Sequence, residues 1–224
     1  MAPIIQNQIS MTDIRRKQAE RSAETSTRIL DGAQKLFSNN GFEGVSMRAI
    51  AAEAQVNLAS IVYYFESKEG LYFAVIDRYA EDILELRRRA VAKADKNPSL
   101  EGYVRAFMEP AFQILLDSKY GGCEFARLLW RLPHEPKFIQ ERMTPKYVTP
   151  IYELYVTCIK KLYPDVSIIY IQFIMHIARS LFFSTLGRSA SSNIWPCEAL
   201  SSDYEEVLNR MVKSLCSALE SMLK

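Results

Sequence analysis

The chain has 224 residues, of which 49% are hydrophobic and 24% are charged, and it contains few glycines (8) and prolines (9). This composition excludes a disordered chain and favours a helical globular protein that can bury a full core. The net charge of +2 is too small to indicate a nucleic-acid partner by itself.

The first segment of the chain is polar, and we interpret residues 1–24 as a flexible basic N-terminal arm. The run at 14–21, Ile-Arg-Arg-Lys-Gln-Ala-Glu-Arg, holds four cations and one anion. It either lies along DNA phosphates or is a solvated, frayed terminus. The N-terminus lacks a basic segment followed by an apolar core, so no secretory signal is evident and we expect a cytoplasmic protein.

The next segments predict three helices that end in a helix-turn-helix. Apolar residues at helical spacing indicate a first helix over 25–39, which Asn40 and Gly41 end. Ser46 and Asn57 are good N-caps for two short helices that a tight turn joins. Two short capped helices in this order are suited to placing the second one in a groove of DNA.

Three stretches, at 28–37, 40–52 and 62–71, resemble the DNA-binding domain of the TetR family of bacterial transcriptional regulators. They include a Gly-Phe turn at 41–42 and the junction Tyr-Tyr-Phe-Glu-Ser-Lys-Glu at 63–69. The resemblance implies an all-α fold. An N-terminal helix-turn-helix DNA-binding domain at 25–70 would be followed by a larger helical effector-binding and dimerisation domain at 71–224.

The resemblance, carried over position by position, implies contacts with double-stranded DNA. Arg48 would reach a base, the face of the second short helix would enter the major groove, and two tyrosines with Lys68 would contact phosphates. The implied set is Arg48, Leu58, Ala59, Ser60, Val62, Tyr63, Tyr64 and Lys68. The alternative is that Leu58 and Val62 belong mostly to the core. Gln55 stands where the family usually has glycine, which costs little unless its backbone is left-handed.

Beyond residue 70 the pattern stays helical. We expect Ser67 to cap a long fourth helix that runs to about Asn97 and connects the DNA-reading head to the rest of the chain. Further helices are expected over 100–116, 123–132, 136–162, 167–186 and 203–223. The stretch 168–186 is about as long as a bilayer requires, but its polar residues favour a helix covered by its own domain and a partner subunit.

The resemblance also implies a homodimer built on the last two helices. The last helix spaces apolar residues by four and three from Tyr204 to Met222, which indicates a packing seam. A protein that reads a palindromic operator gains from matching two-fold symmetry, whereas the alternative is a seam that packs within its own chain. The expected interface residues are Ile174, Ile177, Leu181, Leu208, Met211, Leu215 and Met222.

An effector pocket is implied among the helices between residues 100 and 186. The candidate lining residues are Phe107, Phe112, Phe125, Trp130, Tyr152, Tyr155, Phe173 and His176. Few charges punctuate this set, which favours a small apolar or aromatic effector. The alternative is that most of these side chains are core, with His176 a hydrogen-bonded core histidine.

No cofactor, metal or enzymatic site is expected. The two histidines lie far apart in the sequence, and neither a Gly-rich phosphate loop nor a Gly-x-Ser-x-Gly motif is present. We interpret the four cysteines, none of them in a Cys-x-x-Cys pair, as reduced thiols. The residues and the resemblance together favour a repressor released from its operator by a small effector. The alternative is a scaffold of the same fold that acts through a protein partner.

Overall fold

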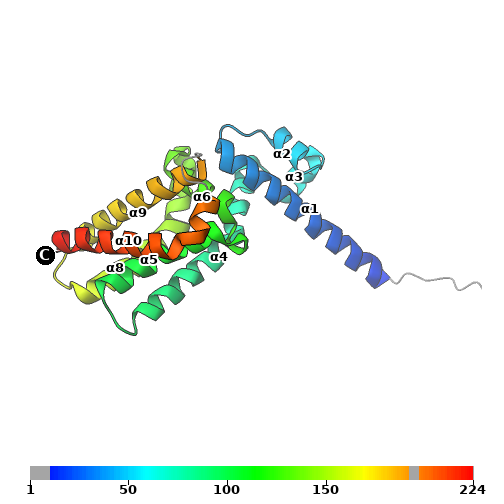
Figure 1. Ribbon diagram of the computed structural model, residues 1–224. Helices are drawn as coiled ribbons and strands as arrows, with labels where there is room; N and C mark the ends of the chain where they lie inside the picture. The colour runs from blue at the N-terminus through cyan, green and yellow to red at the C-terminus, as the bar shows by residue number, and fades with distance from the viewer. Residues whose placement is uncertain (1–10, 192–196, 224) are drawn as a thin grey trace, which may run out of the picture.

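The computed structural model describes residues 11–191 and 197–223, with side chains at 11–13, 15–180 and 203–223, and this part of the chain is helical without strands (Figure 1). The α-helices are α1 (Met11–Asn40), α2 (Met47–Glu53), α3 (Leu58–Phe65), α4 (Lys68–Ala94), α5 (Leu100–Leu116), α6 (Gly122–Arg131), α7 (Lys137–Met143), α8 (Thr149–Leu162), α9 (Ile168–Ser191) and α10 (Cys197–Leu223). Short 3-10 turns, η1 (Ser118–Tyr120) and η2 (Leu132–His134), and a π-helical turn, η3 (Thr144–Val148), join some of them. The predicted all-α fold is confirmed.

The caps read from the sequence are those that the structure uses. The side chains of Ser46, Asn57 and Ser67 accept hydrogen bonds from backbone N–H groups in the first turns of α2, α3 and α4. Each capping bond satisfies a donor that a helix start would otherwise leave without a partner. These caps fix where the two helices of the helix-turn-helix begin.

The first helix differs from the expectation, because it begins at Met11 rather than near Thr25. Residues 11–24, expected as an unstructured arm, therefore continue α1 well past the head, as Figure 1 shows. Arg16 pairs with Asp13 three residues before it and with Glu20 four residues after it. Such pairs stabilise an exposed helix, and no glycine or proline interrupts residues 11–31.

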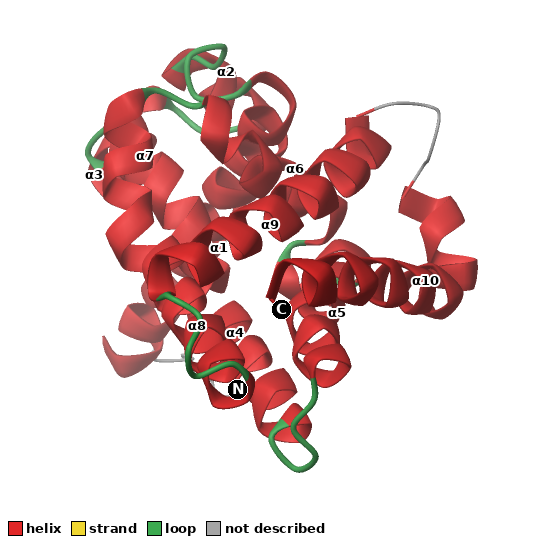
Figure 2. Cartoon of the chain, turned by 90° about the vertical axis from the view of Figure 1, so that its left-hand side faces the viewer, coloured by secondary structure: helices red, strands yellow, loops and turns green. Residues whose placement is uncertain are grey.

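Two buried clusters make up the core of the described part of the chain. The first joins α1, α2, α3 and α4 of the head to parts of α5, α6 and α7, with Phe37, Ile61 and Tyr72 fully buried at its centre. The second joins the C-terminal end of α4 to α5, α8, α9 and α10. Helix α4 contributes to both clusters and is therefore the element that links the head to the body. Figure 2 shows the same helices after a turn of 90° about the vertical axis.

Helix α5 carries Pro110 in its interior. Proline has no N–H to donate, so the carbonyl of Ala106 loses its usual helical partner. The hydroxyl of Tyr155, on α8, donates to that carbonyl at 2.7 Å. The carbonyl that Pro110 leaves without a helical partner thus gains a donor from α8.

None of the described helices combines the length and the apolar character that a bilayer crossing requires. Of the four cysteines, Cys158 and Cys216 are free thiols, as expected. The expectation of a reduced thiol is wrong for Cys123, which takes part in a disulfide. The side chain of Cys197 lies outside those that the structure describes.

The turn between α2 and α3 holds Gln55 in the left-handed region, at a φ of 54°. Backbone bonds from Val56 to Ala51 and from Gln55 to Ala52 close the end of α2 around it. This is the helix-ending arrangement in which glycine is normally preferred, because a Cβ atom crowds the backbone there. The head therefore carries local strain at Gln55.

We predict that Gln55→Gly stabilises the protein by about 1 kcal/mol, because it removes this Cβ penalty. Urea unfolding followed by circular dichroism measures the change. Gln55→Ala is the matched control, since alanine keeps the Cβ and should leave the free energy of unfolding nearly unchanged. A Gln55→Gly variant no more stable than Gln55→Ala would contradict the assignment.

Candidate nucleic-acid interface and internal cavity

Helix α3 buries one face and presents the other to solvent. Ile61 is fully buried, whereas Leu58 is 38%, Val62 48% and Tyr63 81% exposed. Leu58 and Val62 thus lie at the surface of the head rather than in its core. Ala59 is also exposed, and Ser60 is half-buried, with its backbone N–H and hydroxyl bonded to Asn57.

The two basic residues expected to contact DNA stand on either side of α3. Arg48, on α2, is exposed and forms no ion pair with any described carboxylate. Lys68 is the first residue of α4, and its ammonium lies 4.4 Å from the centroid of the Phe42 ring. Both belong to the helices that precede and follow α3 in the sequence.

The N-terminal part of α1 passes beside the end of α3. The hydroxyls of Ser22 and Tyr64 are hydrogen-bonded at 2.9 Å, and the rings of Tyr63 and Tyr64 meet edge to face. Helices α1 and α3 enclose a concave surface. Arg15 and Arg21 line it together with Ser22, Tyr63 and Tyr64. The structure therefore brings part of the basic run next to the expected phosphate-contacting tyrosines, an arrangement that sequence reasoning missed.

A cavity of about 300 Å³ lies between α4, α5, α6, α8 and the turn η3. Three of the expected pocket residues, Phe107, Phe125 and Tyr152, line it. Its volume falls at the lower end of the range of small-molecule sites in proteins. The wall that α4 contributes runs from Ile76 to Arg87.

The other expected pocket residues lie elsewhere. Phe112 is fully buried in the second core, and Tyr155 lines a separate cavity of about 40 Å³. Trp130 is half-buried and packs near His134, with ring centroids 6.1 Å apart. Phe173 and His176 are exposed on α9 in the single chain.

Sequence reasoning missed the charged residues in the cavity wall, which are Asp77, Glu81, Arg87, Lys146 and Arg179. A signal for one of them was present. Leu71, Val75, Tyr79 and Ile83 follow one another every four residues on the buried face of α4, and Arg87 is the next position in that series. A charged residue at the position of a core residue is a candidate for function.

The expected dimer residues divide into two groups. Ile174 and Leu208 are buried inside their own chain, whereas Ile177, Met211, Leu215 and Met222 are partly exposed. The side chain of Leu181 lies outside those described. The large apolar side chains that α9 does expose include Ile169 (79%) and Phe173 (54%).

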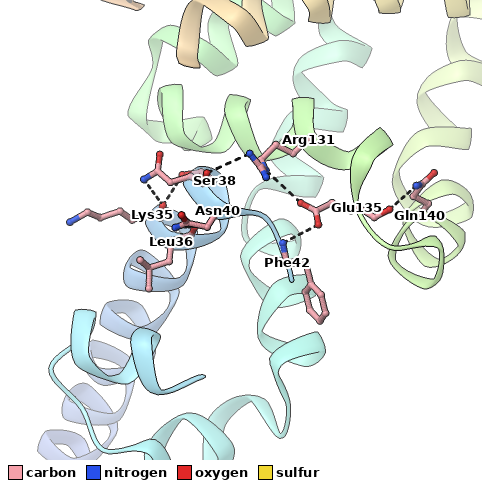
Figure 3. Close-up of polar contacts among 9 residues, drawn as sticks. Lys35, Leu36, Ser38, Asn40, Phe42, Arg131, Glu135 and Gln140 are labelled. Atoms are coloured by element: carbon pink, nitrogen blue, oxygen red, sulfur yellow. Dashed lines mark hydrogen bonds and ion pairs between the residues drawn. The ribbon is translucent and has the colours of Figure 1, made fainter. Parts of the chain in front are cut away.

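The head is tied to the body at the end of α1. The buried carboxylate of Glu135 accepts a hydrogen bond from the backbone N–H of Phe42 at 2.9 Å, and Arg131 lies 3.8 Å from its other oxygen (Figure 3). Gln140 donates to the backbone carbonyl of Glu135 at 2.7 Å. Gly41 has a φ of 71°, and a Cβ there would meet the Arg131 guanidinium at 2.8 Å. At this φ any residue with a Cβ is strained, so glycine is the residue that the turn favours.

The comparisons with known proteins agree with this architecture. A family model described as "Bacterial regulatory proteins, tetR family" matches residues 29–75. A second, "Tetracyclin repressor-like, C-terminal domain", matches residues 105–218, just over half of the chain's 224 residues. The chain therefore belongs to the TetR family, which is a family of DNA-binding transcriptional regulators.

Relatives with assigned roles match over part of their length. The chain is 31% identical to the HTH-type transcriptional regulatory protein RaaS of Mycobacterium tuberculosis over 131 residues, which cover 55% of this chain and 59% of RaaS. It is 33% identical to the probable HTH-type transcriptional regulator YttP of Bacillus subtilis over 91 residues, 41% of this chain and 42% of YttP. The matched parts thus span less than two thirds of these relatives.

Solved structures match over most of the chain. A transcriptional regulator from Aquifex aeolicus aligns with a TM-score of 0.59 at 19% identity, covering 88% of this chain and 99% of the other. HlyIIR, a hemolysin II transcriptional regulator, aligns with a TM-score of 0.58 at 21% identity, covering 87% and 98%. At these identities the likeness shows the fold alone.

We predict that Glu135→Ala lowers the free energy of unfolding by roughly 1–3 kcal/mol, because it leaves the buried N–H of Phe42 without an acceptor. Urea unfolding measures the loss. Glu141→Ala on the exposed face of α7 removes a surface ion pair with Lys137 and should change stability by less than about 0.5 kcal/mol. Equal losses in the two variants would show that Glu135 does not hold the head.

Proposed function

We propose that this chain is a repressor that binds a palindromic operator as a homodimer and leaves it when a small molecule fills the cavity. The observation that carries the proposal is the double role of α4. Its N-terminal part packs under α3 in the first core, and its middle part forms a wall of the cavity. A ligand that favours one position of α4 would thereby favour one position of the recognition helix.

Base reading by this head would depend on few hydrogen bonds. The exposed face of α3 offers Leu58, Ala59 and Val62, which can contact thymine methyl groups but donate nothing to base edges. Arg48 would supply the direct contact, and the sequence-dependent shape of DNA the rest. Phosphate contacts would come from Tyr63, Lys68 and the basic side of α1. We therefore expect a strong dependence of affinity on salt.

We predict that Arg48→Ala weakens operator binding and relaxes the preference at one base pair by about 1–3 kcal/mol. Tyr63→Ala and Lys68→Ala should weaken binding to all sequences alike, because phosphates carry no sequence information. Fluorescence anisotropy against a set of single-base operator variants measures both effects. Lys213→Ala, on the exposed side of α10, serves as the control. Unchanged base preference in Arg48→Ala would contradict its assignment.

The dimer would use the apolar face that α9 leaves exposed. Ile169 and Phe173 lie one turn apart, and a monomer gains nothing from presenting them to water. Burial of the same patch on both subunits would give the two-fold axis that a palindromic operator requires. Ile177, Met211, Leu215 and Met222, which are partly exposed, are the other expected contributors.

We predict that Phe173→Asp converts the dimer to a monomer, because it places a charge in an apolar contact. Sedimentation equilibrium at micromolar concentration measures the molecular mass. Thr157→Asp adds the same charge on the exposed side of α8 and should leave the dimer intact. A Phe173→Asp protein that keeps the dimer mass would place the interface elsewhere.

Footprinting of the purified protein on the DNA upstream of its own coding region tests the function itself. We expect a protected site with two-fold symmetry. Protection no stronger than on unrelated DNA at the same salt concentration would count against an operator there. Such a repressor would work in the cytoplasm, where its operator lies.

The alternative is a scaffold of the same fold that acts through a protein partner and needs no effector. A solid core between α4 and α8 would have favoured it, whereas the cavity of about 300 Å³ favours sensing. No enzymatic role is proposed. Within the described residues, no group of three or more His, Cys, Asp and Glu side chains could hold a metal ion.

A further inference from the structure

One arginine in the wall of the cavity is buried almost completely. Arg87 is only 6% exposed, and its guanidinium, which stays charged at every physiological pH, carries five N–H donors. One of its terminal nitrogens donates to the backbone carbonyl of Phe107 at 3.1 Å, and the Tyr155 hydroxyl lies nearby. Its Nε–H is buried and has no hydrogen-bond partner.

No described carboxylate forms an ion pair with Arg87, although ion pairs are frequent elsewhere in the chain. A buried guanidinium without a counter-charge is unfavourable unless something supplies one. The positive charge is instead balanced only by dipoles, a carbonyl and a phenol. The described side chains around Arg87 therefore supply no negative charge to balance its guanidinium.

The carboxylates that share the cavity are already engaged. Asp77 lies 2.6 Å from the Lys146 ammonium and also accepts from the Tyr147 hydroxyl. Glu81 pairs with Arg88 at 3.5 Å, and its side chain is 85% exposed at the outer edge. Neither carboxylate pairs with the Arg87 guanidinium.

Besides Lys146, which is paired with Asp77, another cation lines the same cavity. The guanidinium of Arg179, on α9, lies 6.0 Å from the centroid of the Tyr152 ring and also has no ion-pair partner among the described residues. Burial raises the pKa of Tyr152, and the charge of Arg179 opposes that rise. The phenol therefore stays neutral and does not neutralise Arg179. The rest of the wall is largely apolar and includes Phe107, Phe125 and Leu129.

We propose that the cavity binds an amphipathic carboxylate, with an aliphatic or aromatic body against the apolar wall and the carboxylate on Arg87. This inference rests on the proposed effector-binding function and names the chemical class of the effector. The planar fork of a guanidinium matches the two oxygens of a carboxylate. Arg179 supplies a second positive charge to the same anion. The apolar or aromatic effector expected from the sequence is thereby given a charged end.

The carboxylate of the effector would also act on α4, the helix that links the cavity to the head. Arg87 belongs to α4, the helix that carries the head, and holds the carbonyl of Phe107 on α5. A carboxylate that accepts hydrogen bonds from this guanidinium competes with the Phe107 carbonyl and so weakens a contact between α4 and α5. Ligand binding and the position of the head are thereby linked through one side chain.

Calorimetry with two matched pairs of probes tests the proposal on the full-length protein. The pairs are octanoate with octanamide and 2-naphthoate with 2-naphthamide, which have nearly the same shape and differ in charge. We expect at least one carboxylate to bind and to do so at least tenfold more tightly than its amide, a difference of about 1.4 kcal/mol. Arg87→Met should remove this preference, and Arg179→Met should reduce it.

Arg88→Met is the control, because Arg88 is the next residue of α4, is exposed and does not line the cavity. It should keep the wild-type preference. If Arg87→Met does not fold, as judged by circular dichroism, the wild-type comparison decides alone. Amides that bind as tightly as the carboxylates, or two carboxylates that fail to bind at millimolar concentration, would overturn the proposal. Because calorimetry involves no DNA and footprinting no ligand, either hypothesis can fail while the other stands.

Discussion

The hydrogen bond from the Phe42 backbone to the buried carboxylate of Glu135 is the contact on which the arrangement of head and body depends. A shared hydrophobic core holds the two parts together, since Phe37 and Ile61 of the head and Phe125 and Leu128 of α6 belong to one cluster. Apolar packing is not directional, however. The buried carboxylate adds direction, because it binds one N–H at the end of α1, and so fixes where the head sits.

Two buried charges therefore have different environments in one chain. Glu135 has a counter-charge within the protein, Arg131 at 3.8 Å, and one of its oxygens accepts from the Phe42 N–H, whereas Arg87 has an ion-pair partner nowhere among the described residues. The first charge suits a structural joint and the second a binding site. Each of the two charges is connected to the cavity through a different helix. Helix α6 contributes to the cavity wall and leads to Glu135, while α4 contributes to the same wall and leads to the recognition helix.

Local chemistry made the helix-turn-helix predictable, because capping by Ser46, Asn57 and Ser67 is decided within a few residues. The start of α1 was missed because its stabilising charge pairs were counted as a basic run. The seam of α10 was read from Leu208, which instead packs inside its own chain together with Val212 and Leu219, positions that the four-and-three spacing had left out. The pattern of α4 could have placed Arg87 on the buried face of that helix, but the cavity itself depends on how several helices meet, and the pattern of one helix does not contain that information.

Hydrogen exchange at the Phe42 amide, followed by NMR, tests most directly whether Glu135 holds the head. Its neighbour Glu43 is exposed in the same turn and serves as the reference. After correction for intrinsic rates, the account predicts that the Phe42 amide exchanges at least about a hundredfold more slowly than the Glu43 amide. Equal protection of the two amides would show that the bond to Glu135 is not maintained, and would contradict the account.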